Sequence, residues 1–225
     1  MQLWELLGVR PGVTAFIGGG GKTTMMYTLA RELVEQGTVL CITTTRIFPP
    51  AHLPVLERVD RGTLERLRCV CVGTPAQETT PVPRGKLSAP AQPIADLAAL
   101  ADWVLVEADG SRGLPLKAHL SHEPVIPPET GRTVVLIGAS AFGRPAREVV
   151  HRLEMFCQLT GASPDAPVTP EIAASLLKAE ALGNMIFVNQ AETADAQSAA
   201  HRLAEMLKTQ LFAGSLQRGE WKCLS

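Results

Sequence analysis

A run of four glycines followed by a lysine and two threonines constrains this chain more than any other feature. Glycine lets a backbone approach an anion closely and adopt positive φ. When a helix follows, its N-terminus adds a partial positive charge. Lys22 would then contact the β- and γ-phosphates of a nucleotide, and the Thr23 hydroxyl would bind Mg²⁺. The sequence therefore predicts a phosphate-binding loop made of Gly18, Gly19, Gly20, Gly21, Lys22, Thr23 and Thr24.

The glycine loop departs from the common phosphate-loop motif at one position. The motif G-x-x-x-x-G-K-[ST] requires a glycine five residues before Gly21, and that residue is Phe16. The loop therefore resembles a shortened or variant form, as in ligases with a GTNGKT-type loop. The alternative is a glycine-rich turn before a helix that carries an incidental lysine. A predicted strand before the loop and a predicted helix after it favour phosphate binding.

Apolar runs and helical periodicity predict an α/β fold. The expected class is a P-loop NTPase-like three-layer sandwich with a mostly parallel sheet, in a single domain of residues 1–225. Prolines in a segment at about 73–93 predict a loop insertion there. Predicted strands are Val13–Ile17, Val39–Thr43, Arg68–Val72, Trp103–Val106, Thr133–Ile137, Met185–Val188 and Leu211–Leu216. Predicted helices are Leu3–Leu7, Thr23–Gln36, Leu64–Leu67, Ile94–Ala101, Val149–Leu159, one that starts at Thr169-Pro170-Glu171, and Ala194–Gln210.

Charge and composition exclude several classes of function. The formal net charge is −1 and no basic stripe is present, so we expect no nucleic-acid partner and no membrane partner. The first residues lack the pattern of a signal peptide and no apolar run reaches membrane-spanning length, so the cytoplasm is the expected location. The five cysteines fit no zinc spacing. Cys69 and Cys71 are expected to be small buried hydrophobic residues, with a redox or metal role as the alternative.

Hydroxyl and acidic side chains follow two of the predicted parallel strands. In such a sheet the carboxyl ends of the strands share the edge where a ligand binds. Thr43, Thr44 and Thr45 end one strand, and we expect Thr44 and Thr45 to contact the nucleotide or its metal ion. The alternative is ordinary capping by hydroxyl groups at a strand end.

Glu107 and Asp109 close another apolar strand, where a Walker B acid is expected. Two residues apart on a strand, they share a face, so both are candidate Mg²⁺ ligands together with Thr23. One would hold the metal while the other orients water as a catalytic base. The sequence does not assign the two roles, and an acidic strand end without a ligand is the alternative.

Further polar candidates come later in the chain. Arg112 is a candidate contact for a phosphate, and Lys117 and His119 are candidate catalytic groups, with surface solvation as the alternative for each. Asn189 follows a strand in the position of the N-K-x-D element that reads guanine, but Gln190 and Glu192 replace its lysine and aspartate. We therefore expect Asn189 to contact the nucleotide, with ATP and GTP both open.

Several of these motifs, in this order, resemble the YqeC family of selenium-dependent molybdenum hydroxylase accessory proteins. The resemblance spans nearly the whole chain. It implies a role in the maturation of selenium-containing molybdenum hydroxylases, with a molybdenum or selenium cofactor intermediate or the hydroxylase apoprotein as partner. It also adds weight to Lys86, Lys117, His119, His151 and Arg152. The matching segments are Phe16–Thr24, Ile42–Pro50, Gly85–Leu87, Val106–His119, Glu123–Pro127 and Val150–Arg152.

The expected function is that of a nucleotide- and Mg²⁺-binding protein, with ATP or GTP as the ligand. One hypothesis is an NTPase or NTP-dependent transferase, since phosphoryl transfer needs mainly positioning and charge neutralisation. A second is a nucleotide-gated assembly chaperone or switch with little turnover. A third is a GTNGKT-type ligase, which would need an acyl-phosphate acceptor site.

Overall fold

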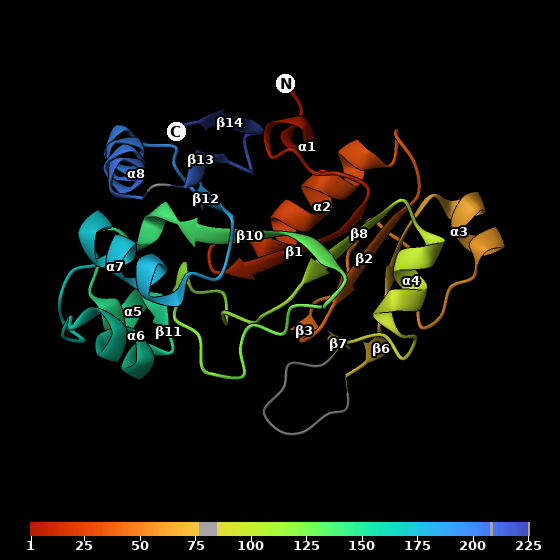
Figure 1. Cartoon of the computed structure of the whole chain (residues 1–225), viewed down its shortest axis with the longest axis horizontal. Helices are drawn as coiled ribbons and strands as arrows, with labels where there is room; N and C mark the ends of the chain where they lie inside the picture. Colours follow the sequence, from red (N-terminus) through yellow and green to blue (C-terminus); the bar gives the residue numbers. More distant parts are fainter. Residues whose placement is uncertain (77–84, 208, 225) are drawn as a thin grey trace. The chain divides into compact units, whose positions relative to one another are not determined.

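The structure is a computed structural model that describes residues 1–76, 85–207 and 209–224. Within these ranges it has eight α-helices and one short 3-10 helix, Ala139–Ala141 (Figure 1). The α-helices are α1 (Leu3–Leu6), α2 (Lys22–Leu33), α3 (Arg61–Leu67), α4 (Ile94–Leu100), α5 (Ala146–Val149), α6 (Leu153–Thr160), α7 (Pro170–Glu180) and α8 (Ala194–Met206). In the described part of the chain, every helix is too short or too polar to cross a lipid bilayer.

Nine strands form a large, mostly parallel sheet, which confirms the predicted α/β class. They are β1 (Gly12–Gly18), β2 (Val39–Thr43), β4 (Val55–Leu56), β5 (Cys69–Val72), β8 (Trp103–Glu107), β10 (Thr130–Gly138), β12 (Met185–Asn189), β13 (Gln210–Ser215) and β14 (Glu220–Cys223). The β13–β14 pair is antiparallel, whereas the other registers of this sheet recorded within each unit are parallel. Sheet and helices together are those of a three-layer α/β sandwich.

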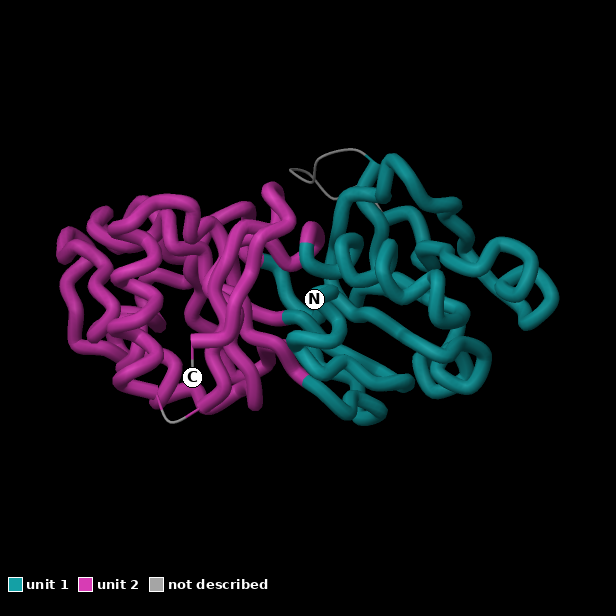
Figure 2. Tube along the Cα trace, turned by 90° about the horizontal axis from the view of Figure 1, so that it is seen from above, with its two compact units in different colours: residues 1–16, 25–110, 125–132 teal, residues 17–24, 111–124, 133–225 magenta. Residues whose placement is uncertain are grey.

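The chain divides into two compact units (Figure 2). Unit 1 consists of residues 1–16, 25–110 and 125–132, and includes the strand order β1-β8-β2-β5-β4. Unit 2 consists of residues 17–24, 111–124 and 133–225, and includes the order β14-β13-β12-β10. In unit 2, α7 packs against both α6 and α8 (Figure 1).

The central strands are buried along their whole length, as near-continuous apolar runs in parallel sheets should be. Every residue of β2, β8 and β12 is buried. Each large aliphatic side chain removed from water in this way contributes about 1.5–3 kcal/mol. Cys41, Cys69 and Cys71 are buried free thiols, which confirms that they serve as small core residues.

Strand register brings the predicted polar residues to one edge within each unit. In unit 1, Glu107 at the end of β8 pairs with Phe16 of β1 and with Thr43 of β2. In unit 2, Gly138 at the end of β10 pairs with Asn189 at the end of β12. These are the carboxyl ends of parallel strands, where ligands of α/β proteins bind.

Helix α7 begins where the sequence predicted. The Thr169 hydroxyl accepts a hydrogen bond of 3.3 Å from the Ile172 N–H, and Pro170 occupies the first turn. A side-chain oxygen at this position satisfies one of the N–H groups that a helix leaves unpaired at its start. The predicted cap is therefore confirmed.

The predicted helix Val149–Leu159 is wrong in its first part. The chain leaves α5 after Val149, forms the short strand β11 (Val150–His151), and begins α6 at Leu153. β11 pairs in parallel with β9 (Leu116–Lys117). Arg152, between β11 and α6, has φ 65°, which no continuous helix contains. Pairing with a distant strand thus overrides the local helical pattern.

The Pro-rich segment at about 73–93 contains two short strands that the sequence did not predict. They are β6 (Thr74–Pro75) and β7 (Leu87–Ser88), and β7 also pairs with β3 (Arg46–Ile47) in a small antiparallel sheet. Lys86, just before β7, places its ammonium 4.6 Å from the centre of the Phe48 ring. Residues 77–84 of the predicted insertion lie outside the described residues.

Candidate functional site

The connection between β1 and α2 is three residues long. β1 continues to Gly18 and α2 starts at Lys22, so Gly19, Gly20 and Gly21 alone form the loop. Phe16, which stands where the common motif has glycine, is a fully buried residue of β1. The strand thus extends through positions that belong to the loop in the common motif, which explains the variant spacing.

Packing in unit 2 requires glycine in this loop. Gly20 has φ 75°, and a Cβ on it would overlap the backbone of Gly138. A Cβ on Gly19 would lie 2.7 Å from the Leu114 carbonyl oxygen. The Gly19 N–H donates to the Leu136 carbonyl at 2.9 Å, and the Gly20 N–H donates to the Leu114 carbonyl at 3.2 Å. Gly19 and Gly20, the first two residues of the loop, are therefore held by hydrogen bonds to backbone carbonyl groups.

Asn189 fastens the same loop from the end of β12. Its Nδ2 donates to the Gly20 carbonyl at 2.8 Å, and its Oδ1 accepts from the Leu216 N–H at 3.0 Å. Gln190 has φ 62° and its Oε1 accepts from the Ser140 hydroxyl at 2.6 Å. Both amides therefore position the loop and its surroundings, and contact of Asn189 with the nucleotide stays a prediction.

Lys22 lies across the loop that precedes it. Its side chain is only 4% exposed, and its Nζ donates to the Gly18 carbonyl at 2.6 Å. Exposure increases from there along the chain, since Thr23 is half-buried and Thr24 is exposed. The solvent-accessible part of the predicted site therefore consists of Gly21, Thr23 and Thr24.

In unit 1, the threonines after β2 are bonded to the end of β8, the strand that leads to the acids predicted for the metal ion. The Thr43 hydroxyl donates to the Glu107 carbonyl at 2.9 Å, and the Thr44 N–H donates to the same oxygen at 3.1 Å. The Thr45 N–H donates to the Thr43 hydroxyl oxygen at 3.0 Å. Asp109 is fully buried and Glu107 is 6% exposed, so each carboxylate lies where solvent screens it little.

The Thr44 hydroxyl donates to the Val125 carbonyl at 2.8 Å, within unit 1. This contact fastens the segment after Pro124 to the end of β2. Thr44 and Thr45 were predicted to contact the nucleotide. The bonds observed for them hold the two strand ends together, and nucleotide contact by either residue stays a prediction.

His119 is oriented by a carboxylate from a distant helix of unit 2. Its backbone N–H donates to Glu180 Oε1 at 2.6 Å, and its ring Nδ1 lies 3.0 Å from Glu180 Oε2. Glu180 is the last residue of α7, where a negative charge is opposed by the helix dipole. A carboxylate that holds Nδ1 fixes the direction of the ring, and a catalytic role for His119 stays a prediction.

Lys117 and Arg152 share one carboxylate, Glu123. The Lys117 side chain is fully buried and its Nζ lies 3.3 Å from Glu123 Oε1. Arg152 donates from Nη2 to Oε1 at 2.9 Å and from Nε to Oε2 at 3.2 Å. Burial raises the pKa of the Glu123 carboxyl, but the hydrogen bonds from Arg152 and the charge of Lys117 outweigh burial and lower it to about 2.

His151 lies beside these cations. Register pairs it with Lys117 across β11 and β9, and its carbonyl accepts from the Ala118 N–H at 3.1 Å. Burial lowers the pKa of the His151 ring to about 4, with further contributions from the charges of Lys117, Arg152 and Arg112. The ring is therefore neutral at pH 7. Arg112, exposed and at φ 54°, belongs to the same group of charges.

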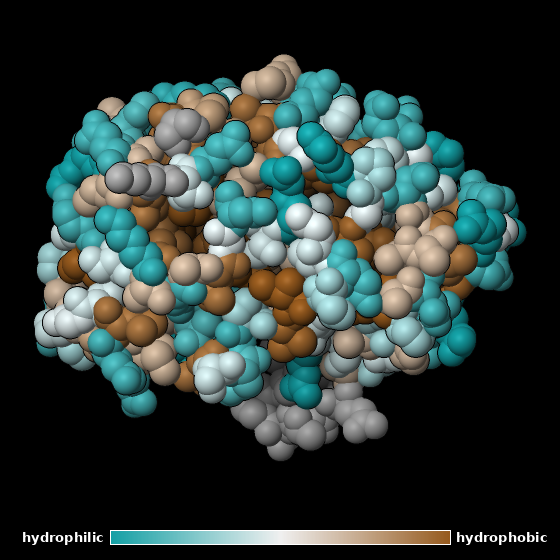
Figure 3. All heavy atoms as spheres, viewed as in Figure 1, coloured by the Kyte–Doolittle hydropathy of each residue, from teal (hydrophilic) through white to brown (hydrophobic). Residues whose placement is uncertain are grey.

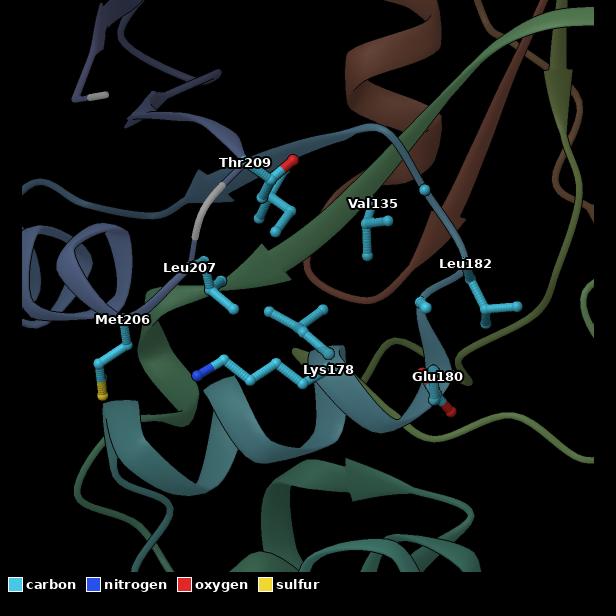
Figure 4. A pocket seen from close by; sticks show the side chains of 11 residues that line it. Val135, Lys178, Glu180, Leu182, Met206, Leu207 and Thr209 are labelled. Atoms are coloured by element: carbon cyan, nitrogen blue, oxygen red, sulfur yellow. The ribbon is translucent and has the colours of Figure 1, made fainter.

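A pocket of about 360 Å³ lies in unit 2, at the end of β12 opposite Asn189. Figure 3 shows a hollow with hydrophobic residues (brown) between α7 and α8, and Figure 4 shows Lys178 and Glu180 at its wall. None of the residues singled out as functional in the sequence lines it. The lining residues are Val135, Leu177, Lys178, Glu180, Ala181, Leu182, Gly183, Ile186, Met206, Leu207 and Thr209.

Glu123 and Glu180 are the residues of this region to which sequence reasoning assigned no role. Glu180 is 61 residues from its partner His119, and no motif links the two. Glu123 lies in one of the matching segments, but nothing in its spacing indicates that it bridges Lys117 and Arg152. Both pairs depend on the tertiary structure.

A family model described as "YqeC protein" matches residues 14–154. "Uncharacterized protein YqeC" of Escherichia coli (strain K12) is 35% identical to this chain over 163 residues. The match covers 70% of this chain and 64% of the relative's length. The residues matched by the family model include the glycine loop, both strand-end acids and the Lys117–Glu123–Arg152 group, whereas Glu180 and Asn189 lie beyond them.

Proposed function

The chain belongs to the YqeC family, and we propose that it binds Mg²⁺ together with ATP or GTP through the start of α2. In this proposal it acts in the cytoplasm as an NTPase or NTP-dependent transferase. The resemblance to accessory proteins of selenium-dependent molybdenum hydroxylases supports a role in the maturation of such enzymes. A cofactor intermediate or the hydroxylase apoprotein would then be the second partner.

The observation that carries this proposal is a buried lysine at the first position of a helix that follows a glycine loop. Lys22 is held against the Gly18 carbonyl, beside the start of α2. A helix cannot satisfy the N–H groups of its first turn internally, and its dipole favours an anion there. Since Gly19 and Gly20 donate to protein carbonyls, we assign the phosphate contacts to Gly21, Lys22, Thr23 and Thr24.

The predicted ligands of the metal fit Mg²⁺ in chemical type. Thr23, Glu107 and Asp109 offer only oxygen atoms, which Mg²⁺ prefers, and this ion commonly takes one or two carboxylates with substrate phosphates. In the described residues, no group of three or more His, Cys, Asp or Glu side chains could hold a metal ion. We therefore propose that the ion binds with the nucleotide, where it would neutralise phosphate charge.

Nucleotide binding predicts a rise in melting temperature. A ligand at one hundred times its Kd adds about 2.7 kcal/mol to the free energy of unfolding. We expect ATP or GTP to raise the melting temperature in a thermal-shift panel, with a larger rise when Mg²⁺ is present. The panel should include ADP, GDP and a nucleoside without phosphate. A nucleoside that stabilises as strongly as the triphosphate would contradict binding through the phosphates.

If Glu107 and Asp109 bind the metal ion, replacing either residue should change how nucleotide binding depends on Mg²⁺. Asp109→Asn and Glu107→Gln keep the shape of each side chain but remove its charge. We expect the Mg²⁺ concentration for half-maximal nucleotide binding to rise about tenfold in at least one variant, as for the loss of one charged ligand worth about 1.4 kcal/mol. Calorimetric titration with Mg²⁺ at a fixed nucleotide concentration measures this half-maximal concentration. Asp165→Asn, on the surface of unit 2, is the control. Unchanged titrations in both variants would show that these acids do not hold the metal.

A further inference from the structure

We propose that Glu180 is a positioning residue that keeps a proton on Nδ1 of His119, so that Nε2 is the ring nitrogen that exchanges a proton during the reaction. The use of His119 as the acid–base group of an NTPase or NTP-dependent transferase rests on the proposed function. The assignment of the two ring nitrogens does not, because it follows from the contacts that Glu180 makes with His119.

Glu180 holds His119 at two points, one with each carboxylate oxygen. Oε1 accepts from the His119 backbone N–H at 2.6 Å, and Oε2 lies 3.0 Å from the ring Nδ1. The His119 side chain is 3% exposed and the Glu180 side chain 8%, so water competes little for these contacts. Because one planar group makes both contacts, it fixes the place of the ring and also the direction in which Nδ1 points.

The chemistry of the carboxylate decides which ring nitrogen carries the proton. A carboxylate only accepts hydrogen bonds, and a neutral imidazole has one N–H and one unprotonated nitrogen. Nδ1 is therefore the N–H, and it donates to Glu180 Oε2. The imidazolium form makes the same bond, since both of its nitrogens are donors. In either form the proton on Nδ1 stays, and the proton that His119 gains or loses is the one on Nε2.

The end of α7 gives Glu180 a fixed place. Glu180 is the last residue of this helix, and Ala181, at φ 47°, closes the last turn by donating from its N–H to the Leu177 carbonyl at 2.9 Å. Figure 4 shows Glu180 at this end of the helix, and α7 packs against both α6 and α8. The carboxylate therefore comes from a packed helix, which is the kind of element that positions a functional group with precision.

The segment that carries His119 also holds the glycine loop. The Leu114 carbonyl accepts from the Gly20 N–H at 3.2 Å, and β9 leads from this contact toward His119. This link within unit 2 supports the use of His119 in the proposed reaction. There the oxygen of water or of an acceptor hydroxyl bonds to the γ-phosphorus, the bond to the leaving nucleoside diphosphate breaks, and the O–H proton passes to His119 Nε2.

Replacing Glu180 by glutamine should move the ring proton of His119 from Nδ1 to Nε2. Glu180→Gln keeps the shape of the side chain, but an amide has one oxygen and one NH₂ group. The His119 backbone N–H bonds only to an acceptor, so the amide oxygen takes the place of Oε1 and the NH₂ group faces Nδ1. Nδ1 then has to accept a hydrogen bond, which leaves the proton of the neutral ring on Nε2.

Long-range ¹H–¹⁵N NMR spectra of the full chain measure this change, because ring nitrogens with and without a proton differ in ¹⁵N shift. The His119 signals are assigned by their loss in His119→Gln. At a pH where the ring is neutral, we expect Nδ1–H in the wild type and Nε2–H in Glu180→Gln. The matched control is Glu205→Gln, an exposed glutamate near the end of α8, which should keep Nδ1–H. A wild-type ring with its proton on Nε2, or a folded Glu180→Gln variant that keeps Nδ1–H, overturns the proposal.

Nucleotide turnover provides the last arm of the test. A general acid–base group contributes about 10²–10⁴-fold to a rate, so kcat should fall at least about a hundredfold in Glu180→Gln, with KM nearly unchanged. An unchanged kcat in a variant whose ring proton has moved would remove Glu180 from the reaction and overturn its positioning role. If the wild type turns over no nucleotide, the proposed function fails, while a proton that moves in Glu180→Gln still supports the assignment of the ring nitrogens.

Discussion

Lys22→Ala is expected to weaken binding of Mg²⁺-nucleotide about thirtyfold. A hydrogen bond to a charged group contributes about 1.5–3 kcal/mol, and 2 kcal/mol corresponds to a factor of about thirty in Kd. Lys22 is the charged side chain nearest in sequence to the start of α2, and its burial keeps water from screening it. Lys22→Ala should therefore lower the affinity for Mg²⁺-nucleotide more than the loss of any single backbone contact in the loop would.

The measurement is Kd by calorimetry or by a fluorescent nucleotide, at one fixed Mg²⁺ concentration. Lys178→Ala is the matched control, because Lys178 is an exposed lysine of unit 2 at the wall of the pocket in Figure 4. Lys22 donates to the buried Gly18 carbonyl, so the variant also needs a melting curve to show that it folds. Equal Kd values for the wild type and a folded Lys22→Ala would refute phosphate binding at this loop.

Glu123→Ala is expected to lower the free energy of unfolding by about 3–5 kcal/mol at pH 7. Removing one partner from a buried ion pair leaves the other charge uncompensated, at a cost of this size. Here Lys117, whose side chain is fully buried, loses its contact with Glu123, and Arg152 loses its ion pair with the same carboxylate. The Glu123 side chain is itself only 15% exposed, so solvent screens this group little.

The loss of stability in Glu123→Ala should become smaller as the pH falls. The pKa of Glu123 falls from 4.5 in the unfolded chain to about 2 in the folded protein, against the opposing effect of burial. A carboxyl with a lowered folded pKa contributes stability above its unfolded pKa and loses it as the pH falls, here about 3 kcal/mol between pH 4.5 and 2. Urea unfolding at a series of pH values should therefore show wild type and variant converging below pH 4.5.

Two further variants separate this cause from a general packing defect. Glu129→Ala, an exposed glutamate of unit 1, should change the free energy of unfolding by less than about 0.5 kcal/mol. Lys117→Met combined with Glu123→Ala should be more stable than Glu123→Ala alone, because the buried charge that lost its contact with Glu123 is gone. If the free energy of unfolding of the double variant falls by the sum of the two single-variant changes, loss of the Lys117–Glu123 pair does not account for the destabilisation in Glu123→Ala.

Much of the fold follows from local patterns in the sequence. The apolar runs at Val39–Thr43 and Trp103–Val106 are buried strands, and the Thr169 cap starts α7 as predicted. These features depend on period, hydrophobicity and one side-chain hydrogen bond, all of which are local. The break in the predicted Val149–Leu159 helix depends on pairing with Leu116–Lys117, which no local pattern contains.

For the site, the sequence by itself determined which residues are present and in what order along the strands: a glycine loop, Lys22 at a helix start, and acids at the end of a buried strand. Chain order and strand period are enough for that. Only the tertiary structure decided that Asn189 holds Gly20, that Glu180 orients His119, and that Glu123 joins Lys117 to Arg152. These contacts join residues far apart in the chain, and their energies arise from burial and charge that exist only once the chain has folded.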